Sequence, residues 1–129
     1  MKQTIAGISI LIAWTVIDAV AHRLALAPLY DSNLKLFRQP SEINPFQAVA
    51  VGVLLVTIFI TIYFQLVSPK SLANGIYLGG LLGAALGAAS GFGTYLHSPI
   101  RPSLALGWFI LGIVKGLVAG AILGITAPR

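Results

Sequence analysis

The chain contains no cysteine, and only three acidic residues stand among its 129 residues. The missing thiols exclude disulfide bonds and thiolate metal sites. Lys and Arg number eight, so the net charge of +5 reflects scarcity of acid rather than a surplus of base. These basic residues lie singly between apolar runs, whereas a nucleic-acid-binding surface gathers them in a stripe. We therefore expect no nucleic-acid partner.

Apolar residues are what the chain has in excess. They make up 57% of it, charged residues make up 9%, and the mean hydropathy is +0.94. Four apolar segments lie at about 4–22, 46–67, 72–96 and 104–127, with a long loop at 23–45. Each is close to the roughly 20 residues that a helix needs to cross a bilayer, where backbone groups must bond internally. The sequence predicts a single all-α transmembrane domain over 1–129, an up-down bundle with both termini on one side.

The ends of these segments carry turn signals. Pro45 and Pro102 stand where a helix tolerates proline, in its first turn. Asp18 interrupts the first apolar run, so we interpret this run as a retained helix rather than a cleaved signal peptide. The basic residues near the segment ends are split almost evenly between the two sides of the membrane. One side has Arg23, Lys35, Arg38 and Arg101, and the other has Lys2, Lys70 and Arg129. The sidedness of the termini therefore stays open.

Glycine recurs at every fourth position in the last two segments. The third carries Gly75, Gly79, Gly83, Gly87 and Gly91, and the fourth carries Gly112, Gly116, Gly120 and Gly124. Such ridges allow helices to approach closely in lipid, where packing replaces water exclusion as the driving force. We expect a glycine zipper between the third and fourth helices; the alternatives are an oligomer contact or a pore lining.

Two charged residues fall inside apolar helices, where charge is expensive and marks a functional candidate. Lys115 lies near the middle of the fourth helix and Asp18 beyond the middle of the first. The two helices run antiparallel in an up-down bundle, so the sequence predicts an Asp18–Lys115 ion pair if they are neighbours. Two interpretations of the pair remain. It either neutralises the two charges and fixes the register of the helices, or it forms part of a proton or ion relay.

His22 follows Asp18 by one helical turn, and His97 closes the third helix after Tyr95 on the same side of the membrane. A hydrogen bond donated by His22 to the Asp18 carboxylate could orient the imidazole. Histidine and tyrosine are common at membrane interfaces, so we expect no metal and no other cofactor. Tyr63 and Trp108 fit interfacial anchors.

Trp14 lies mid-helix, where packing against neighbouring helices is expected. In the long loop, apolar Leu34, Leu36 and Phe37 alternate with basic residues. This pattern is typical of a segment on the membrane surface, or of a lid over a site between the helices.

Several of these residues carry a resemblance. Asp18 and His22, the "PLY" ending at Tyr30, the "LFR" ending at Arg38, Glu42, and "GTYLHSPIRPSLALGWF" from 93 to 109 resemble an uncharacterised family of small bacterial four-helix inner-membrane proteins. The chain departs from that pattern at Phe37, where Trp is usual, and at Ile43, where Met is usual. The resemblance implies location in the bacterial inner (plasma) membrane. It also implies a polar cluster on the first-loop side that joins Asp18, His22, Tyr30, Arg38 and Glu42, near Tyr95 and His97.

No hydrolase, kinase or dinucleotide motif is present, and we expect no enzymatic activity. Two hypotheses remain. The first is a structural or accessory subunit, with the lipid bilayer and other integral membrane subunits, or itself, as partners. The second is a small homo-oligomeric permease or ion-coupled carrier that uses Asp18, His22 and Lys115. It predicts a wet cavity that reaches Asp18 between the first and fourth helices, whereas the first predicts a dry core with Asp18 and Lys115 directly paired.

Overall fold

The structure is a computed structural model that describes residues 1–127, without the side chains at 32–34 and 40. The described residues form helices and connecting turns, with no strand. Four helices are long and apolar enough to cross a membrane: Lys2–Ala25, Pro45–Leu66, Leu72–His97 and Pro102–Thr126. The prediction of an all-helical chain with four candidate membrane spans is confirmed. Leu34, by its side chain, and Arg129 lie outside the described part of the chain.

The spans are built from the following elements. The first is α1 (Lys2–Val20) followed by the π-helical turn η1 (Ala21–Ala25), and the second is α3 (Pro45–Leu66). The third is α4 (Leu72–Ala88), the π-helical turn η4 (Ala89–Gly93) and α5 (Thr94–His97), and the fourth is α6 (Pro102–Thr126). The first loop holds α2 (Ala27–Tyr30), η2 (Asp31–Leu36) and η3 (Pro40–Glu42).

Local sequence explains where these helices begin. Pro45 and Pro102 occupy the first turns of α3 and α6, where the missing N–H has no helical partner to lose. The side chain of Asn44 caps α3 by accepting the N–H of Phe46, and the Ser71 hydroxyl caps α4 by accepting the N–H of Asn74. The helices start at or up to two residues before the predicted positions because these caps and prolines precede the apolar runs.

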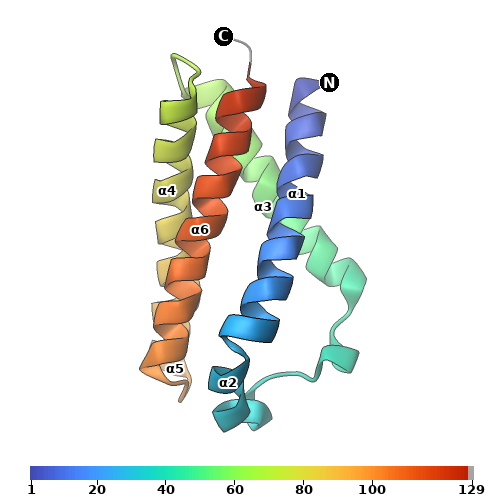
Figure 1. Ribbon diagram of the computed structural model, residues 1–129, viewed down its shortest axis with the longest axis vertical. Coiled ribbons are helices and arrows are strands. Elements are labelled where there is room, and N and C mark those ends of the chain that lie inside the picture. The colour runs from blue at the N-terminus through green and yellow to red at the C-terminus, as the bar shows by residue number, and fades with distance from the viewer. Residues whose placement is uncertain (128–129) are drawn as a thin grey trace.

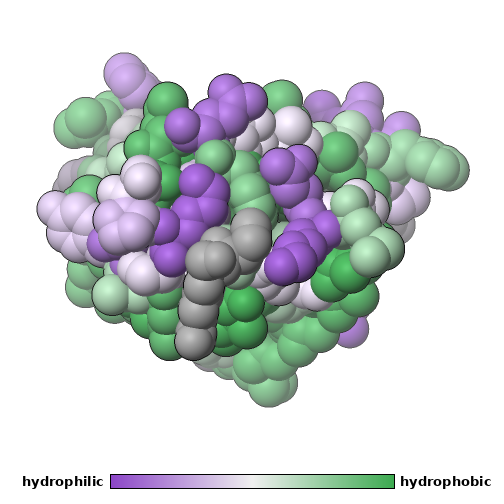
Figure 2. All heavy atoms as spheres, turned by 90° about the horizontal axis from the view of Figure 1, so that it is seen from above, coloured by the Kyte–Doolittle hydropathy of each residue, from purple (hydrophilic) through white to green (hydrophobic). Residues whose placement is uncertain are grey.

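The spans lie side by side, with the start of α1 and the end of α6 at the same end of the molecule (Figure 1). Seen from that end, hydrophilic side chains gather over the end surface, whereas hydrophobic side chains cover much of the flanks (Figure 2). Large apolar residues such as Ile8, Ile12, Val16 and Leu81 are more than half exposed on those flanks. Such an apolar surface is compatible with contact to lipid tails, whereas its exposure to water would be unfavourable.

The tightest contact in the molecule joins α4 to α6 (Figure 1). A methyl group added at Gly79 would collide with the Gly116 carbonyl oxygen, and one at Gly112 would lie 2.6 Å from the Gly87 Cα. The same holds for every glycine in the two predicted ridges, each of which faces backbone of the other span: Gly75, Gly79, Gly83, Gly87, Gly91, Gly112, Gly116, Gly120 and Gly124. Any larger residue there would force the two helices apart. The ridges are therefore covered within the chain.

Aromatic side chains fill the space between α1, α3 and α6. Trp14 on α1 is 5% exposed and stands edge-on to Phe59 of α3, with ring centroids 5.5 Å apart. Tyr63, near the end of α3, is fully buried and donates its hydroxyl hydrogen to the Ser71 carbonyl at 3.0 Å. The expected interfacial anchoring of Tyr63 is therefore wrong, because this bond ties α3 to the start of α4. Trp14 packs as expected.

The first half of α3 takes no part in this core. Every residue from Pro45 to Leu54 is exposed except the half-buried Gly52, whereas Val56, Phe59 and Tyr63 are buried. The helix is tilted, so that its beginning lies away from α4 and α6 and its end meets them (Figure 1). This divergence leaves room between α3 and the α4–α6 pair.

Candidate functional site

Two charged residues of the spans, Asp18 and Lys115, meet inside the bundle. Lys115 Nζ lies 2.7 Å from Asp18 Oδ2, so the predicted ion pair is present. The lysine side chain runs back toward the start of α6, the direction in which helical side chains lean, and reaches the level of Asp18. Asp18 stands seven residues before the end of the first span, about 10 Å from it. The pair thus lies within the apolar part of the molecule rather than at its end.

Trp14 positions this pair from the same helix face. Its indole N–H donates to the Lys115 carbonyl oxygen at 2.9 Å, which fixes the register of α1 against α6. Its ring also lies 4.9 Å from Lys115 Nζ, a distance at which an aromatic face stabilises a cation. One tryptophan therefore holds both the backbone and the ammonium group of Lys115.

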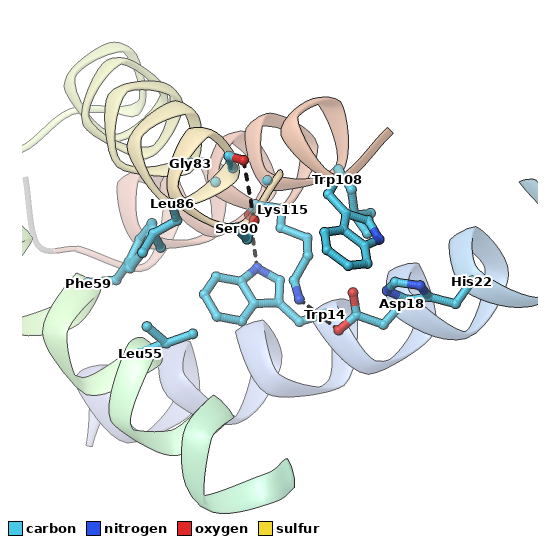
Figure 3. A pocket seen from close by; sticks show the side chains of 14 residues that line it. Trp14, Asp18, His22, Leu55, Phe59, Gly83, Leu86, Ser90, Trp108 and Lys115 are labelled. Carbon is cyan, nitrogen blue, oxygen red and sulfur yellow. Dashed lines mark hydrogen bonds and ion pairs between the residues drawn. The ribbon is translucent and has the colours of Figure 1, made fainter. Parts of the chain in front are cut away.

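A cavity of about 430 Å³ opens beside the ion pair. It is bounded by α1, η1, α3, α4, η4 and α6, and the side chains that line it come from all of these elements (Figure 3). Its lining combines polar groups, tryptophans, aliphatic side chains and glycines: Trp14, Asp18, His22, Leu55, Phe59, Gly83, Leu86, Gly87, Ser90, Trp108, Leu111, Gly112, Lys115 and Gly116. Its volume falls within the range of small-molecule sites, about 300–1,000 Å³.

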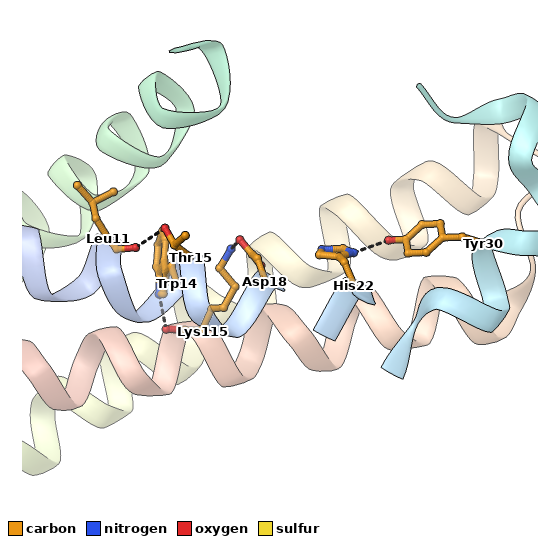
Figure 4. A network of polar contacts seen from close by, with 7 residues as sticks. All are labelled: Leu11, Trp14, Thr15, Asp18, His22, Tyr30 and Lys115. Carbon is orange, nitrogen blue, oxygen red and sulfur yellow. Dashed lines mark hydrogen bonds and ion pairs between the residues drawn. The ribbon is translucent and has the colours of Figure 1, made fainter. Parts of the chain in front are cut away.

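A second polar contact continues from the cavity toward the first loop. His22 Nδ1 lies 2.7 Å from the Tyr30 hydroxyl, and Figure 4 shows His22 between Asp18 and Tyr30 along the molecule. The Trp108 indole N–H donates to the same hydroxyl oxygen at 2.6 Å. Because indole can only donate, the Tyr30 hydrogen is free to bond to a neutral His22. Trp108 therefore holds Tyr30 in place, and its expected role as an interfacial anchor stays a prediction.

Tyr30 is held in an aromatic cluster with Phe37 and Trp108. The Tyr30 and Phe37 rings stand edge-on at 5.2 Å, and Phe37 and Trp108 do so at 5.9 Å. Burial raises the pKa of the Tyr30 phenol above its ordinary value of 10.0; the Asp18 charge acts in the same sense and the hydrogen bond from Trp108 in the opposite sense. Tyr30 therefore stays a neutral hydroxyl, able to donate and to accept, at physiological pH.

The other residues of the predicted loop-side cluster lie elsewhere. Arg38 is exposed and has no ion-pair or hydrogen-bond partner among the described side chains. Glu42 accepts the backbone N–H of Gln39 at 2.8 Å and so stabilises the loop itself. Tyr95 is 45% exposed, and His97 is exposed at the end of α5. Of the cluster that the resemblance implies, the structure joins only His22 and Tyr30, with Asp18 one turn away.

The expected hydrogen bond between Asp18 and His22 is also not formed, because both side chains bond to other partners. The Asp18 carboxylate bonds to Lys115 and His22 bonds to Tyr30. In the described part of the chain, no group of three or more His, Asp or Glu side chains could hold a metal ion. The ion pair and the His22–Tyr30 contact are therefore two separate polar contacts on one side of the cavity.

Three lining features were missed by sequence reasoning. Phe59 and Leu55 belong to an evenly apolar helix, so no pattern marks the side that turns inward. Ser90 sits in a glycine- and alanine-rich stretch that carries no pattern to mark it, and it lines the cavity from the π-helical turn η4. Trp108 was noticed, but its partner Tyr30 lies 78 residues away.

No protein-family model, curated protein or solved structure matches the chain. The resemblance to small bacterial inner-membrane proteins therefore remains a prediction.

Proposed function

We propose that the chain is a small, non-enzymatic membrane permease or ion-coupled carrier that binds its solute in the cavity beside Asp18 and Lys115. The observation that supports it is the cavity itself, which reaches Asp18 between α1 and α6 and is lined by Asp18, His22 and Lys115. Ionisable groups in membrane spans typically mark such pathways. The Asp18 side chain is 39% exposed, so its carboxylate is accessible from the cavity.

The ion pair supplies a coupling device. Uptake of one proton by the Asp18 carboxylate removes its negative charge and breaks the pair, and the Lys115 ammonium is then free to bind an acceptor group of the solute. Release of that proton restores the pair and competes with the solute for Lys115. His22 and Tyr30, bonded at 2.7 Å, offer a hydrogen-bonded path from the cavity toward the first loop.

The same proposal includes the membrane arrangement. The α4–α6 contact acts as a glycine zipper that makes these two helices one rigid unit, and the four spans form an up-down bundle in the bacterial inner membrane. The divergent first half of α3 is then the part free to move against that unit. That the carrier assembles as a homo-oligomer remains a prediction.

A second candidate, a structural or accessory subunit of a membrane assembly, is favoured by the direct 2.7 Å contact between Lys115 and Asp18. A pair that only neutralises charge would have this geometry. The α4 and α6 ridges offer no docking surface for such a role because they face each other.

Water access to the cavity separates the two candidates. The chain has no cysteine, so a single Ser90→Cys substitution introduces a unique thiol in the cavity wall. In reconstituted vesicles, we expect a charged, membrane-impermeant methanethiosulfonate reagent to label Ser90→Cys, because only a hydrated thiol ionises and reacts. The matched control is Leu81→Cys, on the exposed flank of the same helix. If Ser90→Cys is as unreactive as Leu81→Cys from both sides, the carrier proposal fails and the subunit role is favoured.

A further inference from the structure

The cavity has two chemically different ends. Asp18, His22 and Lys115 supply polar atoms toward the first-loop side, whereas Leu55 and Phe59 of α3 supply only apolar surface. Figure 3 shows these two groups on opposite sides of the Trp14 indole. A molecule that fills this space must itself have a polar end and an apolar body.

Both π-helical turns of the described chain contribute a polar residue to this wall. The turn η1 carries His22 and the turn η4 carries Ser90, and each interrupts a membrane span near its loop-side end. Single π-helical turns inside helices are found frequently at functional sites because they redirect side chains at the cost of regular bonding. The presence of two π-helical turns around one cavity marks this place as a candidate site independently of the ion pair.

The charges at the polar end cancel. Asp18 Oδ2 bonds to Lys115, which leaves Oδ1 as an acceptor and the remaining ammonium hydrogens as donors. No bond to Oδ1 is found among the described side chains. A cationic head would be repelled by Lys115 and an anionic head by Asp18. A head that both donates and accepts, without net charge, can bond to Asp18 and to Lys115 at the same time.

The apolar side of the cavity meets the hydrocarbon layer. Leu55 is the first residue of α3 to line the cavity, and the helix before it lies away from the bundle (Figure 1). Leu86 of α4 lines the cavity and is at the same time 39% exposed. Leu86 therefore belongs both to the cavity wall and to the exposed surface that would face lipid. An alkyl chain can therefore enter sideways without crossing water.

We propose that the cavity binds an amphiphile with an uncharged head that donates and accepts hydrogen bonds, such as a long-chain alcohol or amide, with its chain directed between α3 and α4. The inference rests on the proposed function in that it names the substrate class of the same site. Asp18 and Lys115 bind the head, and Leu55, Phe59 and Leu86 contact the chain.

The chain carries its own probe for this site. It has two tryptophans, and both line the cavity. Bromine quenches indole fluorescence on contact, so we would titrate the reconstituted protein with a dodecyl chain brominated beside its head group. Four heads are compared on the same chain: a hydroxyl, no head, a quaternary ammonium and a sulfonate. We expect the brominated alcohol to quench the fluorescence saturably. Its half-maximal effect should come at a mole fraction about tenfold lower than for the other three compounds. This difference corresponds to about 1.4 kcal/mol of binding free energy.

Two matched variants test whether the saturable quenching comes from binding in the cavity. Leu86→Phe fills the lipid-facing side of the cavity and should abolish the saturable part, whereas Leu81→Phe, the same change on the exposed flank of α4, should retain it. Equal quenching by all four heads, or a preference for the ammonium or sulfonate head, would overturn the proposal. The comparison of heads is made on the native chain, so it decides the matter even if Leu86→Phe fails to fold.

The two proposals fail separately. Labelling of Ser90→Cys without selective quenching leaves a carrier whose solute is not an amphiphile of this class. Selective quenching without labelling leaves an amphiphile site in a protein that does not transport.

Discussion

At the scale of single residues, the ion pair between Asp18 and Lys115 is the feature that most constrains function. Each charge alone at membrane depth costs up to about 3 kcal/mol, and the 2.7 Å contact offsets that cost. Trp14 adds to this by bonding to the Lys115 backbone and facing its ammonium group. The pair is therefore stable enough to persist and exposed enough, on its Asp18 side, to exchange partners.

Single and double substitutions of this pair separate stability from function. We expect Asp18→Leu to destabilise the protein by about 2–3 kcal/mol because Lys115 is left unpaired in an apolar setting. The double variant Asp18→Leu with Lys115→Met should recover most of that loss, since no lone charge remains. Unfolding in mixed detergent micelles, followed by far-UV circular dichroism, measures both. A single variant as stable as the native chain would show that Lys115 reaches solvent unaided.

At the scale of elements, α4 and α6 form the most closely packed pair of helices, whereas the first half of α3 is largely exposed. Facing glycines bring the two backbones together along the length of α4 and through η4. By contrast, α3 contacts the rest of the bundle mainly through its second half, where Val56, Phe59 and Tyr63 are buried. The cavity lies at the boundary between these two parts, where relative movement would alter it most.

Alanine substitution within the ridge tests this contact. A methyl group at Gly79 would meet the Gly116 carbonyl and the Gly120 backbone, so we expect Gly79→Ala to destabilise the protein by about 1–3 kcal/mol. Gly93→Ala is the matched control, since a methyl group there meets nothing within 4 Å. It should be neutral or gain up to about 1 kcal/mol from helix propensity. Thermal unfolding of both variants in the same detergent makes the comparison, and equal losses would contradict close backbone contact at Gly79.

At the scale of the whole molecule, the amino-terminal end of α1 and the carboxyl-terminal end of α6 lie together, and the long first loop lies at the opposite end (Figure 1). The cavity is nearer to the loop end, because Asp18, His22 and Tyr30 succeed one another toward it (Figure 4). In the proposed carrier, a solute that enters from the loop side or from lipid would therefore meet these polar residues early.

Reporter fusions test this arrangement in cells. A fluorescent protein that folds only in the cytoplasm should give the same signal when fused before Lys2 or after the end of the chain. A reporter inserted at Gln39, in the exposed part of the loop, should give the opposite signal. Different signals from the two terminal fusions would contradict an even number of spans. The result also decides the sidedness, which the nearly even distribution of Lys and Arg leaves open.

Much of this protein follows from local sequence. The lengths and apolarity of the four segments determine helices that can span a bilayer, and Asn44, Pro45, Ser71 and Pro102 determine where three of them begin. The spacing and lean of side chains were sufficient to predict the Asp18–Lys115 pair, because both charges stand out against apolar surroundings.

Tertiary structure alone decided which side of each apolar helix turns inward. Evenly apolar helices such as α3 carry no amphipathic signal in lipid, so the burial of Tyr63 and the inward face of Phe59 depended on how the helices pack. The partnership of Tyr30 with His22 and Trp108, and the cavity between α3 and the α4–α6 pair, arose from a π-helical turn and a tilted helix. Residue spacing does not encode either of them, because both depend on the direction in which a whole helix leaves the bundle.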